Sequence, residues 1–258
     1  MKFQLLPSSF NGNGIVSPQQ HLSCFVIDDF LAIDAGSLGM AVSDLQKKQI
    51  RNVILTHAHL DHIAGLPLFI DNLFVNLEKP FAVHATEKVI DILQKNIFNW
   101  EIYPRFSELK NEFGEVLKYF PFDIGKEFSI GEFSVTAIEV NHRVQSVGFI
   151  ISKGKSKIAF SGDTAETSAF WEIINTQNFI SAIFIECALP NQLLNLAETS
   201  HHLTPKKLAG ELKKLKNRHC PVYVINLKPM YREQIKQQID DLAIRNVKVL
   251  EVGKVYKF

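Results

Sequence analysis

The order of apolar and polar positions along the chain predicts a mixed α/β protein. Short apolar runs separated by turn residues predict strands, and apolar residues three or four positions apart predict helices. Strands are expected over residues 2–6, 22–27, 30–33, 53–55, 81–84, 133–140, 147–152 and 157–161. Helices are expected over residues 41–49, 66–76, 87–98, 166–175, 205–215 and 233–243. Two sheets packed face to face, with helices outside, would accommodate this order.

The length and composition favour one soluble domain over residues 1–258. The chain shows no internal repeat, no low-complexity tract and no Pro/Gly/Ser-rich linker. A formal net charge of +1 does not call for nucleic acid as an obligatory partner. Pro7 interrupts the N-terminal apolar residues before a signal peptide could form, and no apolar run is long enough to span a membrane.

Cysteine usage indicates a reducing compartment. Cys24, Cys187 and Cys220 lie far apart and form no CxxC pair. Two of them lie inside apolar runs, which is typical of buried reduced thiols. We therefore expect a cytoplasmic protein without disulfides.

Four potential metal ligands crowd into six positions directly after the predicted strand at 53–55. They are His57, His59, Asp61 and His62. Imidazole and carboxylate groups are ligands for Zn²⁺, Mn²⁺ and Fe²⁺, and a tight loop after a strand can direct alternating residues at two neighbouring points. Any one of these residues alone would be an ordinary surface or core residue, but the four together predict two adjacent ions.

Further candidates stand at the ends of predicted strands. Asp34 follows the strand at 30–33, His142 follows the strand at 133–140, and Asp163 follows the strand at 157–161 within Ser-Gly-Asp-Thr. A carboxylate at a strand end is often only a cap or turn residue. A sandwich would gather the loops at its strand ends along one edge, so these residues are candidates for a shared site.

The run HxHxDH, followed by a later His and a later Asp, resembles the ligand pattern of the metallo-β-lactamase-fold hydrolases. The resemblance implies an α/β fold of the four-layered αββα sandwich type and two divalent ions, zinc first, with manganese or iron as alternatives. It implies one ion on His57, His59 and His142, a second on Asp61 and His62, and Asp163 between them. Asp34 would then support the loop that carries the ligands.

One position departs from that pattern. Members of the family place a further His on the second metal near the C-terminus, where this chain has Asn226-Leu227-Lys228-Pro229. Asn226 is the candidate ligand there, and because an amide oxygen is neutral the second site would be looser, favour a harder ion such as Mn²⁺, or recruit another group. His219 lies in a polar turn and is expected to be exposed.

Several other segments resemble the class II cyclic-nucleotide phosphodiesterases. These segments are residues 59–67, 96–104, 185–187 and 202–205. The ribonuclease Z branch shares the general plan, but its long Gly/Pro-rich arm has no counterpart here. His202 precedes the predicted helix start at Thr204-Pro205 and could meet an anionic phosphate, whereas its neighbour His201 is expected to be structural. For Phe98, Trp100 and Tyr103, core packing and base stacking are both open.

The resemblance implies hydrolysis of 3′,5′-cyclic nucleotides to 5′-nucleotides by a hydroxide that bridges the two ions, with Asp61 and His202 as catalytic residues. A homodimer is a further expectation from this branch. Two alternatives remain open. One is a ribonuclease Z-like or other phosphodiester hydrolase of the same fold. The other is a non-catalytic nucleotide-binding relative, which the Asn at position 226 would favour.

Overall fold

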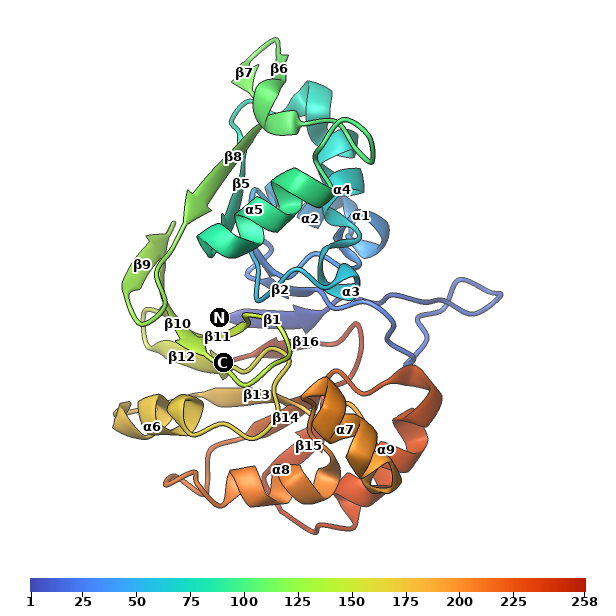
Figure 1. Ribbon diagram of the computed structural model, residues 1–258, viewed down its shortest axis with the longest axis vertical. Coiled ribbons are helices and arrows are strands. Elements are labelled where there is room, and N and C mark those ends of the chain that lie inside the picture. The colour runs from blue at the N-terminus through green and yellow to red at the C-terminus, as the bar shows by residue number, and fades with distance from the viewer. The chain divides into compact units, whose positions relative to one another are not determined.

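The computed structural model describes residues 1–258 and contains two compact units. The first unit comprises Met1–Asp123 together with Val252–Lys257, and the second comprises Ile124–Glu251 with Phe258. Each unit is built on one seven-stranded sheet with helices against it (Figure 1).

The sheet of the first unit changes from antiparallel to parallel along its order β16-β1-β2-β3-β4-β5-β8. Strands β16, β1, β2 and β3 pair antiparallel, and β3, β4, β5 and β8 pair parallel. The carboxyl ends of β3 and β4 therefore lie side by side. The strands are β1 (Lys2–Leu5), β2 (Phe25–Ile27), β3 (Leu31–Ile33), β4 (Asn52–Ile54), β5 (Phe81–Ala85), β8 (Leu117–Pro121) and β16 (Val255–Lys257), beside a small hairpin of β6 (Lys110–Asn111) and β7 (Gly114–Glu115).

Four of the five helices of the first unit bury apolar side chains in its core. The five helices are α1 (Leu38–Ala41), α2 (Asp44–Gln49), α3 (Leu60–Ile63), α4 (Leu66–Leu73) and α5 (Glu87–Asn96), with single turns at Phe74–Asn76 and Phe106–Glu108. In α5, Thr86 accepts a hydrogen bond from the Val89 amide and caps the helix, and Val89 and Leu93 enter the core. Full burial of one such side chain contributes about 1.5–3 kcal/mol.

The sheet of the second unit has the order β15-β14-β13-β12-β11-β10-β9. Strands β9 to β12 pair antiparallel, and β12 to β15 pair parallel. The loops that follow β12, β13 and β14 therefore leave the same edge of the sheet. The strands are β9 (Glu127–Ile130), β10 (Phe133–Glu139), β11 (Val147–Lys153), β12 (Ser156–Phe160), β13 (Ala182–Glu186), β14 (Val222–Ile225) and β15 (Val247–Val249).

Helices α6 (Ala169–Thr176), α7 (Leu194–Ser200), α8 (Pro205–Leu212) and α9 (Arg232–Asp240) complete the second unit, with single turns at Asn191–Leu193 and Pro229–Tyr231. Thr204 caps α8 by accepting from the Lys207 amide, and Pro205 occupies the first helical position. Leu208 of α8 and Ile235 of α9 belong to the same buried apolar cluster as Val224 of β14. This packing fixes the helices against the parallel half of the sheet.

The structure contains most of the predicted elements and several that the apolar pattern does not reveal. The expected helix at 41–49 is divided into α1 and α2, because Ser43 forms a capping box with Gln46 and starts a new helix. The expected helix at 166–175 begins only at Ala169, and helix α3 lies inside the HxHxDH run. Strands β6 to β9, β13, β15 and β16 and helix α7 are additional elements.

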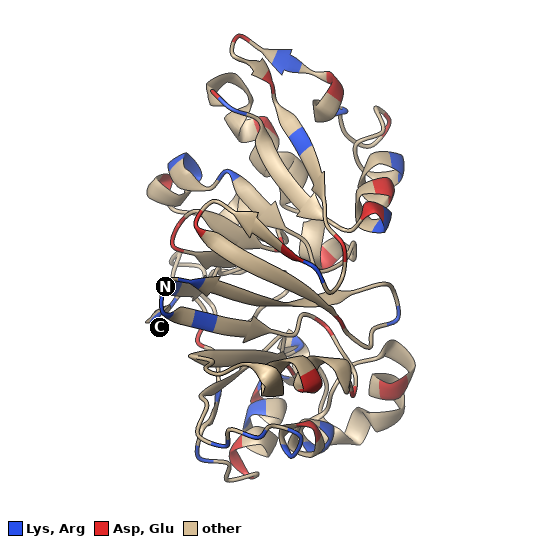
Figure 2. Ribbon diagram, turned by 90° about the vertical axis from the view of Figure 1, so that its left-hand side faces the viewer, with Lys and Arg blue, Asp and Glu red and all other residues tan.

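Three further expectations concern the state of the cysteines, the distribution of charged residues and membrane-spanning helices. All three cysteines are buried and unbridged, as expected. Figure 2 shows basic and acidic residues spread over the elements of both units, in keeping with the net charge of +1. None of the helices combines the length and apolar character that a membrane span requires.

His84 on β5 is a buried imidazole with a depressed pKa. Its side chain stacks on Phe120 with ring centroids 5.0 Å apart, and its Nε2 lies 3.1 Å from Asn52 Oδ1. Because an amide oxygen only accepts, Nε2 must carry the proton of a neutral ring. Burial lowers the pKa of His84 from 6.5 to about 4.

We expect this histidine to make the folded state acid-sensitive. The unfolded chain takes up the proton near pH 6.5 and the folded chain only near pH 4, so stability is complete above pH 6.5 and is lost as the pH falls from there toward 4. The free energy of unfolding should drop by about 2 kcal/mol between pH 7.5 and pH 5 through this group. Urea unfolding of wild type and His84→Gln at both pH values measures it, and an equal pH dependence of the two proteins would contradict the assignment.

Candidate metal centre

Asp34 fixes the HxHxDH loop in the first unit. It follows β3, is fully buried, and has a left-handed backbone with φ 58°, a conformation that Asp adopts more readily than most residues. Its carboxylate accepts from the Thr56 amide at 2.8 Å and from the Thr56 hydroxyl at 2.9 Å. His62 Nδ1 lies 2.7 Å from Asp34 Oδ2, the oxygen that also accepts from the Thr56 hydroxyl. One carboxylate thus determines where the loop after β4 begins and how His62 is oriented.

The backbone of the same segment is joined to the loop by further hydrogen bonds. The Ala35 amide donates to the His62 carbonyl at 2.7 Å, and the Gly36 amide donates to the Ser23 carbonyl at 2.8 Å. The Ser23 amide in turn donates to the Asp61 carbonyl at 2.8 Å. The loop is therefore held by main-chain as well as side-chain contacts.

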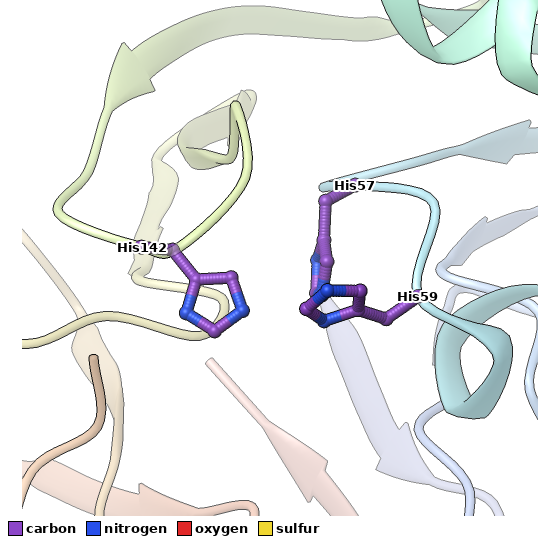
Figure 3. Close-up of side chains that lie close together, drawn as sticks. All are labelled: His57, His59 and His142. Carbon is purple, nitrogen blue, oxygen red and sulfur yellow. The ribbon is translucent and has the colours of Figure 1, made fainter. Parts of the chain in front are cut away.

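Three imidazoles of the first unit lie together. The ring centroid of His57 is 4.5 Å from that of His59 and 4.2 Å from that of His62. His57 and His62 are buried, whereas the Asp61 side chain is 35% exposed and its carboxylate lies 3.9 Å from His62 Nε2. Figure 3 shows the His57 and His59 side chains on the loop after β4 and the His142 side chain on the loop after β10.

The electrostatics of Asp34 balance burial against hydrogen bonding. Burial raises the pKa of Asp34, and the His62 ring and the Thr56 donors oppose that rise. A buried carboxylate in a loop costs desolvation energy, which its three donors offset.

The second unit presents its own donor set. Nitrogen or oxygen atoms of His142, Asp163 and His202 lie within 4.8 Å of one another, and the rings of His142 and His202 are 5.1 Å apart between centroids. Asp163 and His202 are buried, and His142 is half-buried. His142 follows β10, Asp163 follows β12, and His202 follows α7, so tertiary packing and not sequence proximity brings these groups together.

Glu186 orients His202. This glutamate ends β13, is fully buried, and has its Oε1 2.7 Å from His202 Nδ1. The amides of Thr164, Ala188 and Leu203 also donate to its carboxylate, at 2.9, 3.0 and 3.2 Å. Burial raises the pKa of Glu186, and His202 opposes the rise. For His202, burial lowers the pKa, but the carboxylates of Glu186 and Asp163 together outweigh burial and the pKa is raised.

The other site residues of the second unit have equally defined partners. His142 Nδ1 lies 3.1 Å from the His201 carbonyl, and the ring of His201 reaches Asn141 Oδ1 at 2.9 Å. His201 is the C-cap of α7 in a left-handed conformation. The amide nitrogen of Asn226 donates to Asp163 Oδ1.

Four of the predicted site histidines are held through the same ring atom, Nδ1, which leaves Nε2 for a metal or a substrate. Their Nδ1 atoms each contact an oxygen of the protein: His57 the Thr56 hydroxyl at 2.9 Å, His62 Asp34, His142 the His201 carbonyl, and His202 Glu186. An outer oxygen that holds Nδ1 fixes the tautomer and leaves Nε2 to face a ligand, which is the arrangement of metal-binding histidines. In each unit, imidazoles and a carboxylate, Asp61 in the first and Asp163 in the second, are donors that suit a divalent transition metal.

The structure also shows which functional residues the sequence did not reveal. Thr56 and Glu186 organise the histidines, but neither is a predicted site residue. A charged residue at the end of the apolar run Ala182–Glu186 is the signal that could have identified Glu186. In the aromatic segment, Phe98 and Tyr103 pack on Phe106, which favours core packing for these two, whereas Trp100 is 54% exposed. His219 is exposed, as expected.

The chain matches a family model described as the beta-lactamase superfamily domain over residues 33–221. Because this match covers most of the chain, the chain belongs to the β-lactamase superfamily. The fold agrees: unliganded yeast PDE1 superposes with a TM-score of 0.75 over 98% of each chain at 18% identity. The metallo-beta-lactamase fold protein YhfI from Bacillus subtilis gives a TM-score of 0.72 over 99% of this chain and 98% of that one, at 15% identity. The predicted metallo-β-lactamase type of α/β fold is confirmed.

Proteins related in sequence narrow the resemblance to two branches of the superfamily. A 3′,5′-cyclic-nucleotide phosphodiesterase of Aliivibrio fischeri is 29% identical over 76% of this chain and 71% of its own length. A protein of Yersinia pestis named "Probable 3′,5′-cyclic-nucleotide phosphodiesterase" is 24% identical over 82% of this chain and 69% of its own length. A ribonuclease Z of Thermosynechococcus vestitus is 29% identical over 48% of this chain and 28% of its own length. The predicted resemblance to both branches is confirmed, and together with the family it supports a hydrolase.

Gly36 offers a direct test of the Asp34 segment. A Cβ at this position would overlap the Asp61 carbonyl oxygen and come within 2.8 Å of the Ser23 backbone, so Gly36→Ala must displace the loop. We expect the free energy of unfolding to fall by about 3 kcal/mol. In the control Gly210→Ala, the exposed α8 position has nothing within 4 Å, and helix propensity should raise stability by about 0.8 kcal/mol. Chemical denaturation of both variants tests this pair, and a tolerated Gly36→Ala would show that the segment is adaptable.

Proposed function

We propose that the chain is a metal-dependent phosphodiesterase that hydrolyses 3′,5′-cyclic nucleotides to 5′-nucleotides. The observation that carries the metal dependence is the anchoring of His57, His62 and His142 through Nδ1, with Asp61 close to His62 and Asp163 close to His142. The substrate class is supported by relatives of that name, which align over about three quarters or more of this chain.

The donor sets of the two units would hold two divalent ions, with zinc as the first expectation and manganese or iron as alternatives. By resemblance to the family, His57, His59 and His142 would hold one ion and Asp61 and His62 the second, with Asp163 shared. The amide nitrogen of Asn226 contacts Asp163 Oδ1 beside this set. When bound, such a pair supplies an activated water and neutralises the charge of a phosphodiester.

The residues of the chain supply orientation and proton transfer. Asp34 and Thr56 keep the first histidine set rigid, so that little reorganisation is needed when substrate binds. His202 would donate a proton from Nε2 to the leaving 3′ oxygen. Glu186 would hold this ring in place, and the raised pKa of His202 keeps the donating form available near neutral pH.

A ribonuclease Z-like activity is the second candidate. Its support is the group of ribonuclease Z relatives, which align with less than half of this chain. The near-neutral net charge gives no long-range attraction for RNA. Cleavage of precursor transfer RNA without turnover of cyclic nucleotides would favour it. A non-catalytic nucleotide-binding protein, the third candidate, would bind nucleotide with one ion or none. The expected homodimer stays a prediction.

The decisive assay is incubation of metal-loaded protein with cyclic AMP, GMP, CMP and UMP, with the 5′-nucleotide as the measured product. We expect turnover of at least one substrate and its loss after chelation. Asp61→Ala should abolish turnover yet change the free energy of unfolding by only about 0.5 kcal/mol, because this side chain is partly exposed. Failure of all four substrates with two ions bound per chain would remove the proposal.

The proton-transfer role of His202 makes a separate prediction. His202→Asn should lower kcat by about 10²- to 10⁴-fold, and Glu186→Gln, which disturbs only the partner of the ring, by about 10- to 100-fold. Both variants should keep the wild-type metal content, measured by elemental analysis. Loss of metal in His202→Asn would instead identify His202 as a ligand.

A further inference from the structure

Asn226 and Asp163 meet at one edge of the second sheet. Strands β12, β13 and β14 are parallel neighbours. Asp163 lies in the loop after β12, Glu186 is the last residue of β13, and Asn226 directly follows β14. The Asn226 side chain crosses this edge and donates its Nδ2–H to Asp163 Oδ1. Asp163 is 3% exposed, so the contact lies in a poorly hydrated place where a hydrogen bond to a carboxylate has a large effect.

The backbone holds Asn226 ready for this contact. Asn226 has φ 58°, in the left-handed region that Asn tolerates better than most residues. On one side of it the Cys187 amide donates to the Ile225 carbonyl at 3.0 Å, and on the other the Lys228 amide donates to the Ala188 carbonyl at 3.1 Å. These two bonds tie both flanks of Asn226 to the segment after β13, so the direction of its side chain is set by the fold.

We propose that Asn226 is a positioning residue that sets the orientation and charge of the Asp163 carboxylate toward a bound metal ion. The inference rests on the proposed function in that it takes Asp163 as a ligand. An N–H donor on Oδ1 fixes the rotation of the carboxylate, directs Oδ2 to the ion and withdraws part of the negative charge. This role differs from direct coordination by the amide oxygen, which the sequence predicts.

The two roles predict opposite effects of one substitution. Asn226→Asp removes the N–H donor and places a second carboxylate beside Asp163. If Asn226 positions Asp163, this change repels Asp163 and weakens metal binding. If Asn226 is a ligand through its oxygen, an anionic oxygen is a stronger ligand than an amide, and binding tightens.

The first measurement uses metal-free protein, so that the result does not depend on catalytic activity. Urea unfolding of wild type, Asn226→Gly, Asp163→Ala and the double variant forms a double-mutant cycle. Gly removes the side chain without adding strain at a positive φ. We expect Asn226→Gly to raise the unfolding equilibrium constant about tenfold more in the wild-type background than beside Asp163→Ala. Equal effects in the two backgrounds would overturn the proposal.

The second measurement is calorimetric titration with Mn²⁺ and with Zn²⁺ at pH 7.5. We expect Asn226→Gly and Asn226→Asp each to weaken the binding of the ion that Asp163 contacts by about tenfold. The control Asn178→Ala removes an exposed side chain before β13, at the other end of that strand, and should leave binding unchanged. Tighter binding by Asn226→Asp would overturn the positioning role.

The test of Asn226 can fail or succeed independently of the test of the proposed function. Coupling between positions 163 and 226, with weakened metal binding, would support the inference even if no cyclic nucleotide is hydrolysed. Turnover of a cyclic nucleotide with no coupling would retain the proposed function and remove the inference.

Discussion

The buried carboxylate of Asp34 is the interaction on which the first donor set depends. It lies at the carboxyl end of β3, beside the parallel strand β4, and accepts hydrogen bonds from the backbone and side chain of Thr56 and from His62. Thr56 then contacts Nδ1 of His57 at 2.9 Å. Two imidazoles therefore take their orientation from one acid. Burying that acid is unfavourable without its donors, so the arrangement is explained by the precision it gives to the loop better than by stability.

The second unit uses the same device with a different acid. Glu186 is the last residue of β13, just as Asp34 directly follows β3. Glu186 is fully buried and accepts hydrogen bonds from three backbone amides and from His202. In both acids burial raises the pKa and an imidazole opposes the rise. Parallel strands make this possible, because their carboxyl ends place consecutive loops at one edge, where a single carboxylate can reach several amides.

The contrast between Asp61 and Glu186 shows what the sequence could predict. The residues of the HxHxDH run lie within six consecutive positions, in the loop after β4 and the start of α3, so their close spacing brings three imidazoles together, and that part of the site was predicted from local pattern. Glu186 and Thr56 act through contacts that only the fold creates: Glu186 reaches Thr164 and His202, which are 22 and 16 positions away. Likewise, three-residue strands such as β15 carry too little periodicity to be recognised, whereas longer apolar runs such as β10 and β11 were predicted nearly in full.

The two donor sets should therefore respond differently to change elsewhere in the chain. The first is carried by one loop whose geometry is fixed by contacts with its own sheet neighbours. In the second, Asp163 and its hydrogen-bond partner Asn226 follow two different strands, so their contact depends on the registers that pair Phe160 with Phe184 and Glu186 with Ile225. Successive side chains of a strand alternate between faces, and a shift of one residue in either pairing would turn the donors away from one another. The register of β12, β13 and β14 is thus the long-range condition for the second donor set, as Asp34 is the local condition for the first.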